Sequence, residues 1–157
     1  MPEISLNEQS ERDWDWYASD QEGMIGHFAT AGCRSLPRSV KQDRDAALRL
    51  IHYFDVEAPK STSYIVRPGA EADEGGWKDD LTREQCLKSF VDMASAGLFS
   101  YDTFLVQPDS YYLVALPDKP IYINQLPEEI RSLVIKIQAR VLFAKSIYIT
   151  EAETLSW

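Results

Sequence analysis

The stretch DWDWYASDQEGMIGHFATAG (residues 13–32) decides how the start of the chain folds. Trp14 and Trp16 alternate with other side chains at the period of two that is typical of a strand with one buried face. The segment SDQEG then supplies a turn, in which Gly23 can take the left-handed conformation that closes a hairpin with a bulge. Residues 24–30 are predicted to form the returning strand. We therefore expect a β-hairpin whose tryptophans point into the core.

The other face of this hairpin is expected to face solvent. Because successive side chains of a strand point to opposite faces, Tyr17 should lie away from the tryptophans, together with Ser19. The acidic side chains of the hairpin belong to that face and to the turn. We therefore predict a partner-binding face made of Asp13, Asp15, Tyr17, Asp20 and Glu22.

Three segments have the periodicity of amphipathic helices. Residues 44–54 place apolar side chains three and four positions apart, and Asp43 can cap their N-terminus. A second helix is predicted to begin at a capping box that starts with Thr82 and to end at Gly97. The third spans residues 127–142, with glutamates in its first turn and an arginine in its last.

The second helix carries one of the two cysteines of the chain. Its buried stripe is predicted to contain Leu87, Phe90, Val91 and Ala94. Cys86 flanks this stripe, and we therefore expect a buried, inert thiol there.

Strands are predicted at residues 64–66, 99–106, 111–116, 121–124 and 146–150, with Pro- and Asp-containing turns between the middle three. The order of elements is then roughly ββαβαβββαβ. Strands joined by short turns, with about three helices between them, predict an α+β fold with a mostly antiparallel sheet. The 157 residues contain no linker, repeat or low-complexity tract, so we expect residues 1–157 to form a single globular domain.

The net charge of −9 is concentrated in two segments. Residues 1–22 carry seven acids against one arginine, and residues 69–80 carry five acids against one lysine, so the rest of the chain has a net charge of +1. Such a surface repels phosphate backbones, and we expect no nucleic-acid partner. It suits a basic protein partner, although acidic segments also serve simply to keep a protein soluble.

The second acidic segment, GAEADEGGWKDD, is predicted to be an exposed loop and a second partner-binding surface. Trp77 either forms an exposed aromatic anchor with a charged rim or folds back onto the edge of the domain. The predicted contact residues of this loop are Glu71, Asp73, Glu74, Trp77, Asp79 and Asp80.

The usual signatures of catalysis and of cofactor binding are missing from the sequence. Two histidines and two cysteines that are scattered singly do not form a structural zinc site, and the glycines form neither a phosphate-binding loop nor a dinucleotide fingerprint. No GxSxG motif is present. We therefore predict no catalytic residue, no metal and no cofactor. An N-terminus without a basic and apolar leader, and apolar runs too short for a bilayer, predict a cytoplasmic protein without a membrane partner.

One alternative remains open, a small-molecule site or an enzyme whose pocket lies near His27, Cys33 and Arg34. A cation beside a thiol lowers the pKa of that thiol, and a nearby histidine can act as a base. No third group that would orient this pair is identifiable in the sequence. A further alternative is a structural or regulatory subunit, which obligate oligomerisation would reveal.

Two stretches resemble small, acidic bacterial proteins, among them immunity proteins that neutralise toxins of polymorphic toxin systems. WYASDQEGMIGHFATAG is similar to their tryptophan–aromatic–alanine strand, Asp-x-x-Gly turn and Ile-x-x-Phe return strand. GLFSYDTF and YYLVALPDKPIYINQLPEEI are similar to a second part of such proteins. The resemblance implies a non-catalytic, partner-binding role. The leading hypothesis is therefore a protein-binding module, in its sharpest form an immunity protein that masks a basic toxin.

Overall fold

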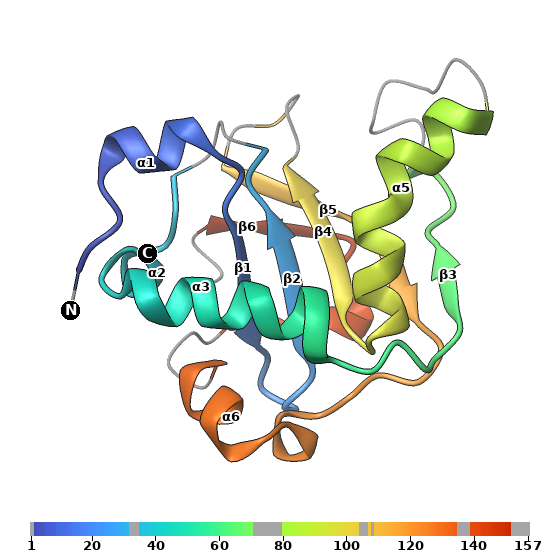
Figure 1. The fold of residues 1–157 in the computed structure, drawn as a ribbon. Helices are drawn as coiled ribbons and strands as arrows, with labels where there is room; N and C mark the ends of the chain where they lie inside the picture. Colours follow the sequence, from blue (N-terminus) through green and yellow to red (C-terminus); the bar gives the residue numbers. More distant parts are fainter. Residues whose placement is uncertain are drawn as a thin grey trace.

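The computed structural model, which describes residues 2–31, 35–70, 80–103, 107, 109–134 and 139–151, has a six-stranded β-sheet at its centre (Figure 1). Its strands are β1 (Asp15–Ser19), β2 (Ile25–Ala29), β3 (Tyr64–Val66), β4 (Phe99–Thr103), β5 (Ser110–Pro117) and β6 (Tyr148–Thr150). The strand order is β1-β2-β4-β5-β3, and β6 also pairs with β5. Most pairs are antiparallel, but β2 and β4 run parallel. The α+β class is thus confirmed, with a mixed sheet.

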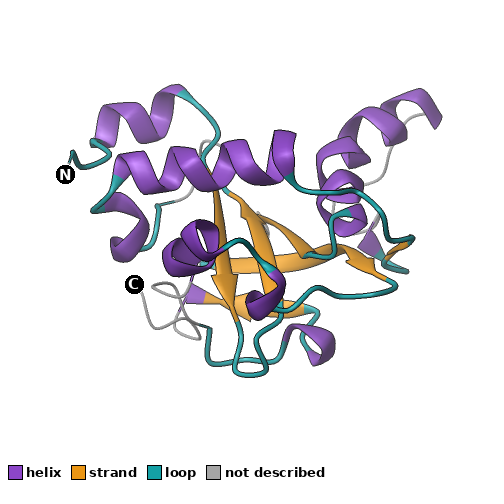
Figure 2. Ribbon diagram, turned by 60° about the horizontal axis from the view of Figure 1, so that its bottom comes forward, coloured by secondary structure: helices purple, strands orange, loops and turns teal. Residues whose placement is uncertain are grey.

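The helices are α1 (Leu6–Glu11), α2 (Arg38–Lys41), α3 (Arg44–His52), α5 (Asp80–Ser95) and α6 (Glu128–Val134). A π-helical turn, η1 (Tyr53–Glu57), continues α3, and two 3₁₀ turns, η2 (Ile123–Gln125) and η3 (Phe143–Lys145), follow later in the chain. Figures 1 and 2 show α3 and α5 on the same side of the sheet. None of the helices in the described ranges is both long and apolar enough to cross a membrane.

The predicted hairpin is confirmed. β1 pairs with β2 from Asp15 opposite Ala29 to Ser19 opposite Ile25, and Gly23 has a φ of +84° in the turn. Trp16 is buried in the core, where its ring stacks on Phe28 with 4.2 Å between the centroids.

The second face of the hairpin is buried as well, which corrects the prediction of an outward-pointing face. Tyr17 is 0% exposed and Ser19 is 5% exposed. Tyr17 packs in a cluster with Leu50 of α3, Met93 of α5 and Ile130 of α6. The alternation of the sequence was consistent with a one-sided strand, but the helices cover the second face of the sheet.

Two local start signals had different outcomes. The side chain of Asp43 accepts a hydrogen bond from the Ala46 N–H and caps α3, as predicted. The second predicted helix begins earlier than the capping box at Thr82, because α5 already starts at Asp80. Cys86 is exposed on α5, so the prediction of a buried thiol was wrong.

Two predicted elements near the C-terminus are also corrected. The segment predicted as a strand at 121–124 leads into the turn η2, and its backbone N–H groups bond carbonyls of two glycines, Ile121 to Gly97 and Ile123 to Gly23. The helix predicted for 127–142 is α6, which is described over Glu128–Val134, and residues 139–142, where the prediction continued it, are not α-helical. The final strand was predicted correctly as β6.

Two short helices, α1 and α2, were not predicted. In α1 the Ser5 hydroxyl and the Glu8 carboxylate form a capping box, and Arg44 binds Glu8 at 2.8 Å. These hydrogen bonds lower the pKa of Glu8 to about 2. They hold the N-terminal segment against the start of α3.

Candidate functional site

A histidine without solvent exposure orients an aspartate at the start of the hairpin. The His27 side chain is 0% exposed, and its Nε2 lies 2.9 Å from the Asp15 carboxylate. Its Nδ1 lies 2.7 Å from the Ser100 hydroxyl of β4. Both ring nitrogens of His27 therefore have a hydrogen-bond partner. Ser100, His27 and Asp15 thus form a chain of hydrogen-bonded side chains. The Asp15 side chain is 25% exposed and is the accessible end of this chain.

Asp15 contributes to a cavity of about 340 Å³ that lies on the helix-covered side of the hairpin. Four carboxylates line it, and each comes from a different part of the fold: the approach to β1, β1 itself, η1 and β4. We call this cavity the acidic pocket, and its aspartates are Asp13, Asp15, Asp55 and Asp102. The remaining lining comes from Arg12, Ala29, Ala31, Ile51, Ser89 and Phe90.

Three of these aspartates lack a strong cationic partner. In the described part of the chain, neither Asp13 nor Asp55 forms an ion pair with an arginine or lysine, and the partner of Asp15 is His27. Asp102 accepts a hydrogen bond from the Tyr112 hydroxyl at 3.4 Å. The guanidinium of Arg12 lies over the Trp14 ring, 4.7 Å from the ring centroid. Among the described residues that line the pocket, four carboxylates thus share one cavity with one guanidinium.

Asp55 has a perturbed acidity in this pocket. Partial burial raises its pKa above the ordinary value of 3.8, and the negative charge of Asp15 raises it further, while His27 and Lys60 act in the opposite direction. Asp55 lies in the π-helical turn η1, and π-helical turns occur frequently at functional sites. Two carboxylates with different environments therefore face one cavity: Asp15 is bonded to a histidine, whereas Asp55 is partly desolvated and is repelled by the charge of Asp15.

The structure separates the predicted hairpin residues into two groups. Asp13 and Asp15 lie together in the acidic pocket, whereas Glu22 is exposed in the turn at the other end of β1. Tyr17 is not a surface contact residue, because its ring stacks on Phe54 at 4.5 Å and burial raises the pKa of its hydroxyl well above the ordinary value.

Asp20 is the second correction among these residues. It is 7% exposed, and its carboxylate accepts hydrogen bonds from the backbone N–H groups of Glu22 and Met24, each at 2.9 Å, and of Phe143 at 3.0 Å. These bonds fix the turn and the segment that packs on it. A carboxylate with three donors and so little exposed surface stabilises the fold and is not a contact residue for a partner.

The second predicted surface lies largely outside the described residues. The predicted contact residues that lie outside the described ranges are Glu71, Asp73, Glu74, Trp77 and Asp79. Asp80 is described only as a backbone position of α5. Cys33 and Arg34, which the alternative hypothesis placed beside His27, also lie outside the described residues.

Sequence reasoning missed Asp55 and Asp102. Asp55 follows the apolar stripe of the predicted first helix, where an acid is unremarkable by itself. Asp102 reaches the pocket because β4 pairs in parallel with β2, with Asp102 opposite Ala29. No local pattern indicates that pairing. Among the described residues, no group of three or more His, Cys, Asp or Glu side chains is placed to hold one metal ion.

No known protein family, curated protein or solved structure matches this chain. What the pocket does must therefore be inferred from its own residues. Its carboxylates are groups that accept hydrogen bonds from guanidinium and ammonium groups at short distances, and the guanidinium of arginine can bind a carboxylate with two parallel bonds.

Proposed function

We propose that this protein is a non-catalytic binding module that recognises a basic protein partner through the acidic pocket. The observation that supports the proposal most is that Asp13, Asp15 and Asp55 line one cavity and that, within the described residues, no arginine or lysine forms an ion pair with them. A protein normally pairs carboxylates that it brings together, because like charges repel. A basic side chain from a partner would supply the missing counter-charge.

The pocket suits an inserted side chain better than a flat contact. Ile51 and Phe90 supply apolar surface for the aliphatic stem of an arginine or lysine, while the aspartates receive its charged end. Anchors of this kind, surrounded by a polar rim, dominate the affinity of many interfaces. The negative charge around the pocket would also accelerate association with a basic partner.

In its most specific form, the proposal is an immunity-type protein that masks a basic toxin. The acidic pocket would then bind a basic side chain that the toxin uses to hold its own anionic substrate. The resemblance of the hairpin to such proteins is consistent with this role, although only Asp13 and Asp15 of the predicted hairpin face line the pocket.

The test is binding of a labelled nonaarginine peptide, followed by fluorescence anisotropy at low and at physiological salt. The double variant D15N/D55N removes two pocket charges and keeps the side-chain shapes. We expect it to weaken binding at least ~10-fold, because hydrogen bonds to charged groups contribute about 1.5–3 kcal/mol each. The amide oxygen that D15N introduces can still accept the proton of His27.

The matched control is D45N/E128Q, which removes the same two charges from exposed positions outside the pocket. We expect the control to change the affinity less than about twofold, because salt screens exposed charges that lie far from the bound peptide. Equal weakening by both double variants would show that the peptide senses only the overall charge, and the pocket would lose its role.

A small-molecule site or an enzyme is the second candidate. The chain of hydrogen-bonded side chains from Ser100 through His27 to Asp15 favours it. Ser100 is 0% exposed, so it cannot act as a nucleophile, and Asp15 would be the base that contacts a cationic substrate. Agmatine distinguishes the candidates, because it carries a guanidinium and an ammonium on a short chain. Binding of agmatine as tight as that of nonaarginine would favour the small-molecule site, and much weaker binding would favour the protein partner.

A further inference from the structure

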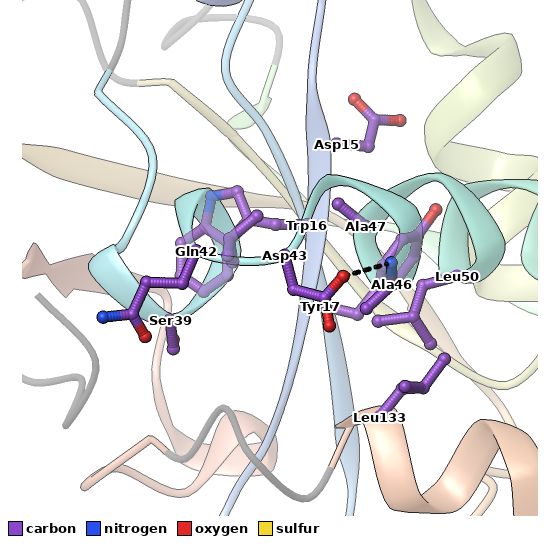
Figure 3. A pocket seen from close by; sticks show the side chains of 11 residues that line it. Asp15, Trp16, Tyr17, Ser39, Gln42, Asp43, Ala46, Ala47, Leu50 and Leu133 are labelled. Atoms are coloured by element: carbon purple, nitrogen blue, oxygen red, sulfur yellow. Dashed lines mark hydrogen bonds between the residues drawn. The ribbon is translucent and has the colours of Figure 1, made fainter. Parts of the chain in front are cut away.

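A second cavity, separate in character from the acidic pocket, lies between helix α3 and the first strand. Its volume is about 280 Å³. Figure 3 shows α3 passing over β1, with Ser39 and Gln42 towards one end of the cavity and Leu50 and Leu133 towards the other. The small side chain of Ala46 contributes to the side formed by α3. We call this space the edge cavity.

The edge cavity runs along the backbone of β1. It is lined by three consecutive residues, Asp15–Tyr17, although neighbouring side chains of a strand point to opposite faces. A space that contacts all three must therefore reach the edge of the strand. β1 is the terminal strand of the sheet and pairs only with β2 among the described strands.

The hydrogen-bond pattern of the hairpin shows which backbone groups face this edge. The Asp20 N–H donates to the Met24 carbonyl, so Asp20 belongs to a pair that is bonded across the hairpin. Bonded and non-bonded pairs alternate in antiparallel strands, so the N–H and C=O groups of Tyr17 and Ser19 point away from β2. In agreement, the Ser19 carbonyl accepts from the Ala139 N–H at 2.8 Å.

Tyr17 therefore directs one donor and one acceptor towards the edge cavity. The described residues supply no hydrogen-bond partner for either group. A buried backbone N–H or C=O without a partner is costly, so such groups normally bond to protein, water or ligand. The Ser39 hydroxyl, another buried polar group of the lining, also lacks a partner among the described residues.

We propose that the edge cavity binds a small uncharged molecule that carries an amide-like group on an apolar ring or chain. The amide would pair with the N–H and C=O of Tyr17 as a neighbouring strand does, and Ser39 would supply a further donor or acceptor. Trp16, Val40 and Leu50 provide apolar contacts for the body of the ligand. The charged groups of the lining are already bonded, Asp43 to the Ala46 N–H and Asp15 to His27.

The size of the edge cavity agrees with a ligand of this class. An apolar cavity of about 150 Å³ is enough to hold benzene, so about 280 Å³ has room for an aromatic ring with an attached amide. A mostly apolar lining with a few well-placed polar groups is also the usual composition of a small-molecule site.

The test uses benzamide as the probe and follows the backbone amide signals of the ¹⁵N-labelled protein by NMR. We expect a saturable shift of the Tyr17 amide signal, with a dissociation constant in the millimolar range or tighter, as is usual for a ligand of this size. Ethylbenzene, which has a similar ring without the amide, should bind at least ~10-fold more weakly because it leaves the backbone groups unpaired.

Two variants connect the signal to the edge cavity. Ala46→Leu fills the space and should abolish the benzamide shift, whereas Ala144→Leu makes the same change at an exposed position and should leave it intact. Ser39→Ala keeps the shape and should weaken binding severalfold. The proposal is overturned if benzamide produces no saturable shift of the Tyr17 signal, if ethylbenzene binds equally well, or if folded Ala46→Leu binds benzamide like the parent protein.

Discussion

At the scale of the residue, Asp15 has two neighbours with opposite effects. His27 stabilises its carboxylate through a hydrogen bond, while Asp55 shares the acidic pocket and repels it. The histidine ring is buried and bonded at both nitrogens, so Asp15 is held in one orientation. Because Asp55 is protonated more easily than an ordinary aspartate, the charge of the pocket is sensitive to pH.

The first prediction concerns the acidity of Asp55. We expect its carboxyl group to titrate above 3.8 in a ¹³C NMR titration, and Asp15→Asn to move the midpoint down by removing the repulsion. A raised native pKa means that the folded protein binds this proton more tightly than the unfolded chain. The free energy of unfolding should therefore fall as the pH rises from 3.8 through the native pKa of Asp55.

Asp45→Asn is the control for this titration, because Asp45 lies on α3 outside the acidic pocket. It should leave the midpoint of Asp55 unchanged. A titration midpoint of Asp55 at or below 3.8 would contradict the arrangement of the two carboxylates, and so would a midpoint that Asp15→Asn leaves unchanged.

At the scale of the element, the boundary between α5 and β4 depends on one glycine. Gly97 has a φ of +96°, and its N–H bonds the Ala94 carbonyl while the Leu98 N–H bonds that of Met93. These bonds end the helix in the manner of a left-handed cap. The space at Gly97 is also closed, since a Cβ placed there would lie 2.6 Å from Ile121 Cγ2 and 3.0 Å from the backbone nitrogen of Ile121.

The second prediction follows from this geometry. Gly97→Ala should lower the free energy of unfolding by about 1–3 kcal/mol or more, because the left-handed backbone is strained by a side chain and the new methyl group displaces Ile121. Urea denaturation measures the effect. Ala96→Gly, at the neighbouring buried position, serves as a control for backbone flexibility, and a Gly97→Ala protein as stable as the parent would contradict the assigned turn.

Elements defined by local signals could be predicted from the sequence, and those defined by distant partners could not. The hairpin turn needs only Asp20 and Gly23, and the start of α3 needs only the side chain of Asp43. The segment at 121–124 has the composition of a strand, but its hydrogen-bond acceptors are the carbonyls of Gly97 and Gly23, which the rest of the fold places beside it.

The candidate site shows the same division. Asp13 and Asp15 are close in sequence and could be predicted as neighbours. Asp55 and Asp102 join them only because α3 crosses the sheet and β4 enters beside β2. The burial of Tyr17 likewise depends on helices that no pattern within the hairpin specifies.

At the scale of the whole molecule, Asp20 connects the first hairpin to the C-terminal part of the chain. Its carboxylate bonds the turn that contains it and also the Phe143 N–H, 123 positions later. Phe143 in turn packs in the core against Phe28, Phe99 and Tyr101. One buried carboxylate thus holds together two segments that meet only in the completed fold.

The third prediction tests this role. Asp20→Ala should lower the free energy of unfolding by about 3 kcal/mol, since it leaves the buried Phe143 N–H and two partly buried N–H groups of the turn without an acceptor. Glu22→Ala, in the same turn but exposed, should change it by no more than about 0.5 kcal/mol. The two variants are compared by urea denaturation, and equal losses of stability would refute a structural role for Asp20.

The parallel pairing of β2 with β4 has a consequence for how the protein is made. Gly26 lies opposite Phe99, so the hairpin leaves the ribosome several seconds before its neighbouring strand, at ordinary rates of synthesis of about 5–20 residues per second. During that interval the tryptophans of the nascent hairpin have no sheet to join, and a chaperone that recognises apolar segments would find them accessible. We therefore expect the order of synthesis, as well as the final stability, to affect the yield of folded protein.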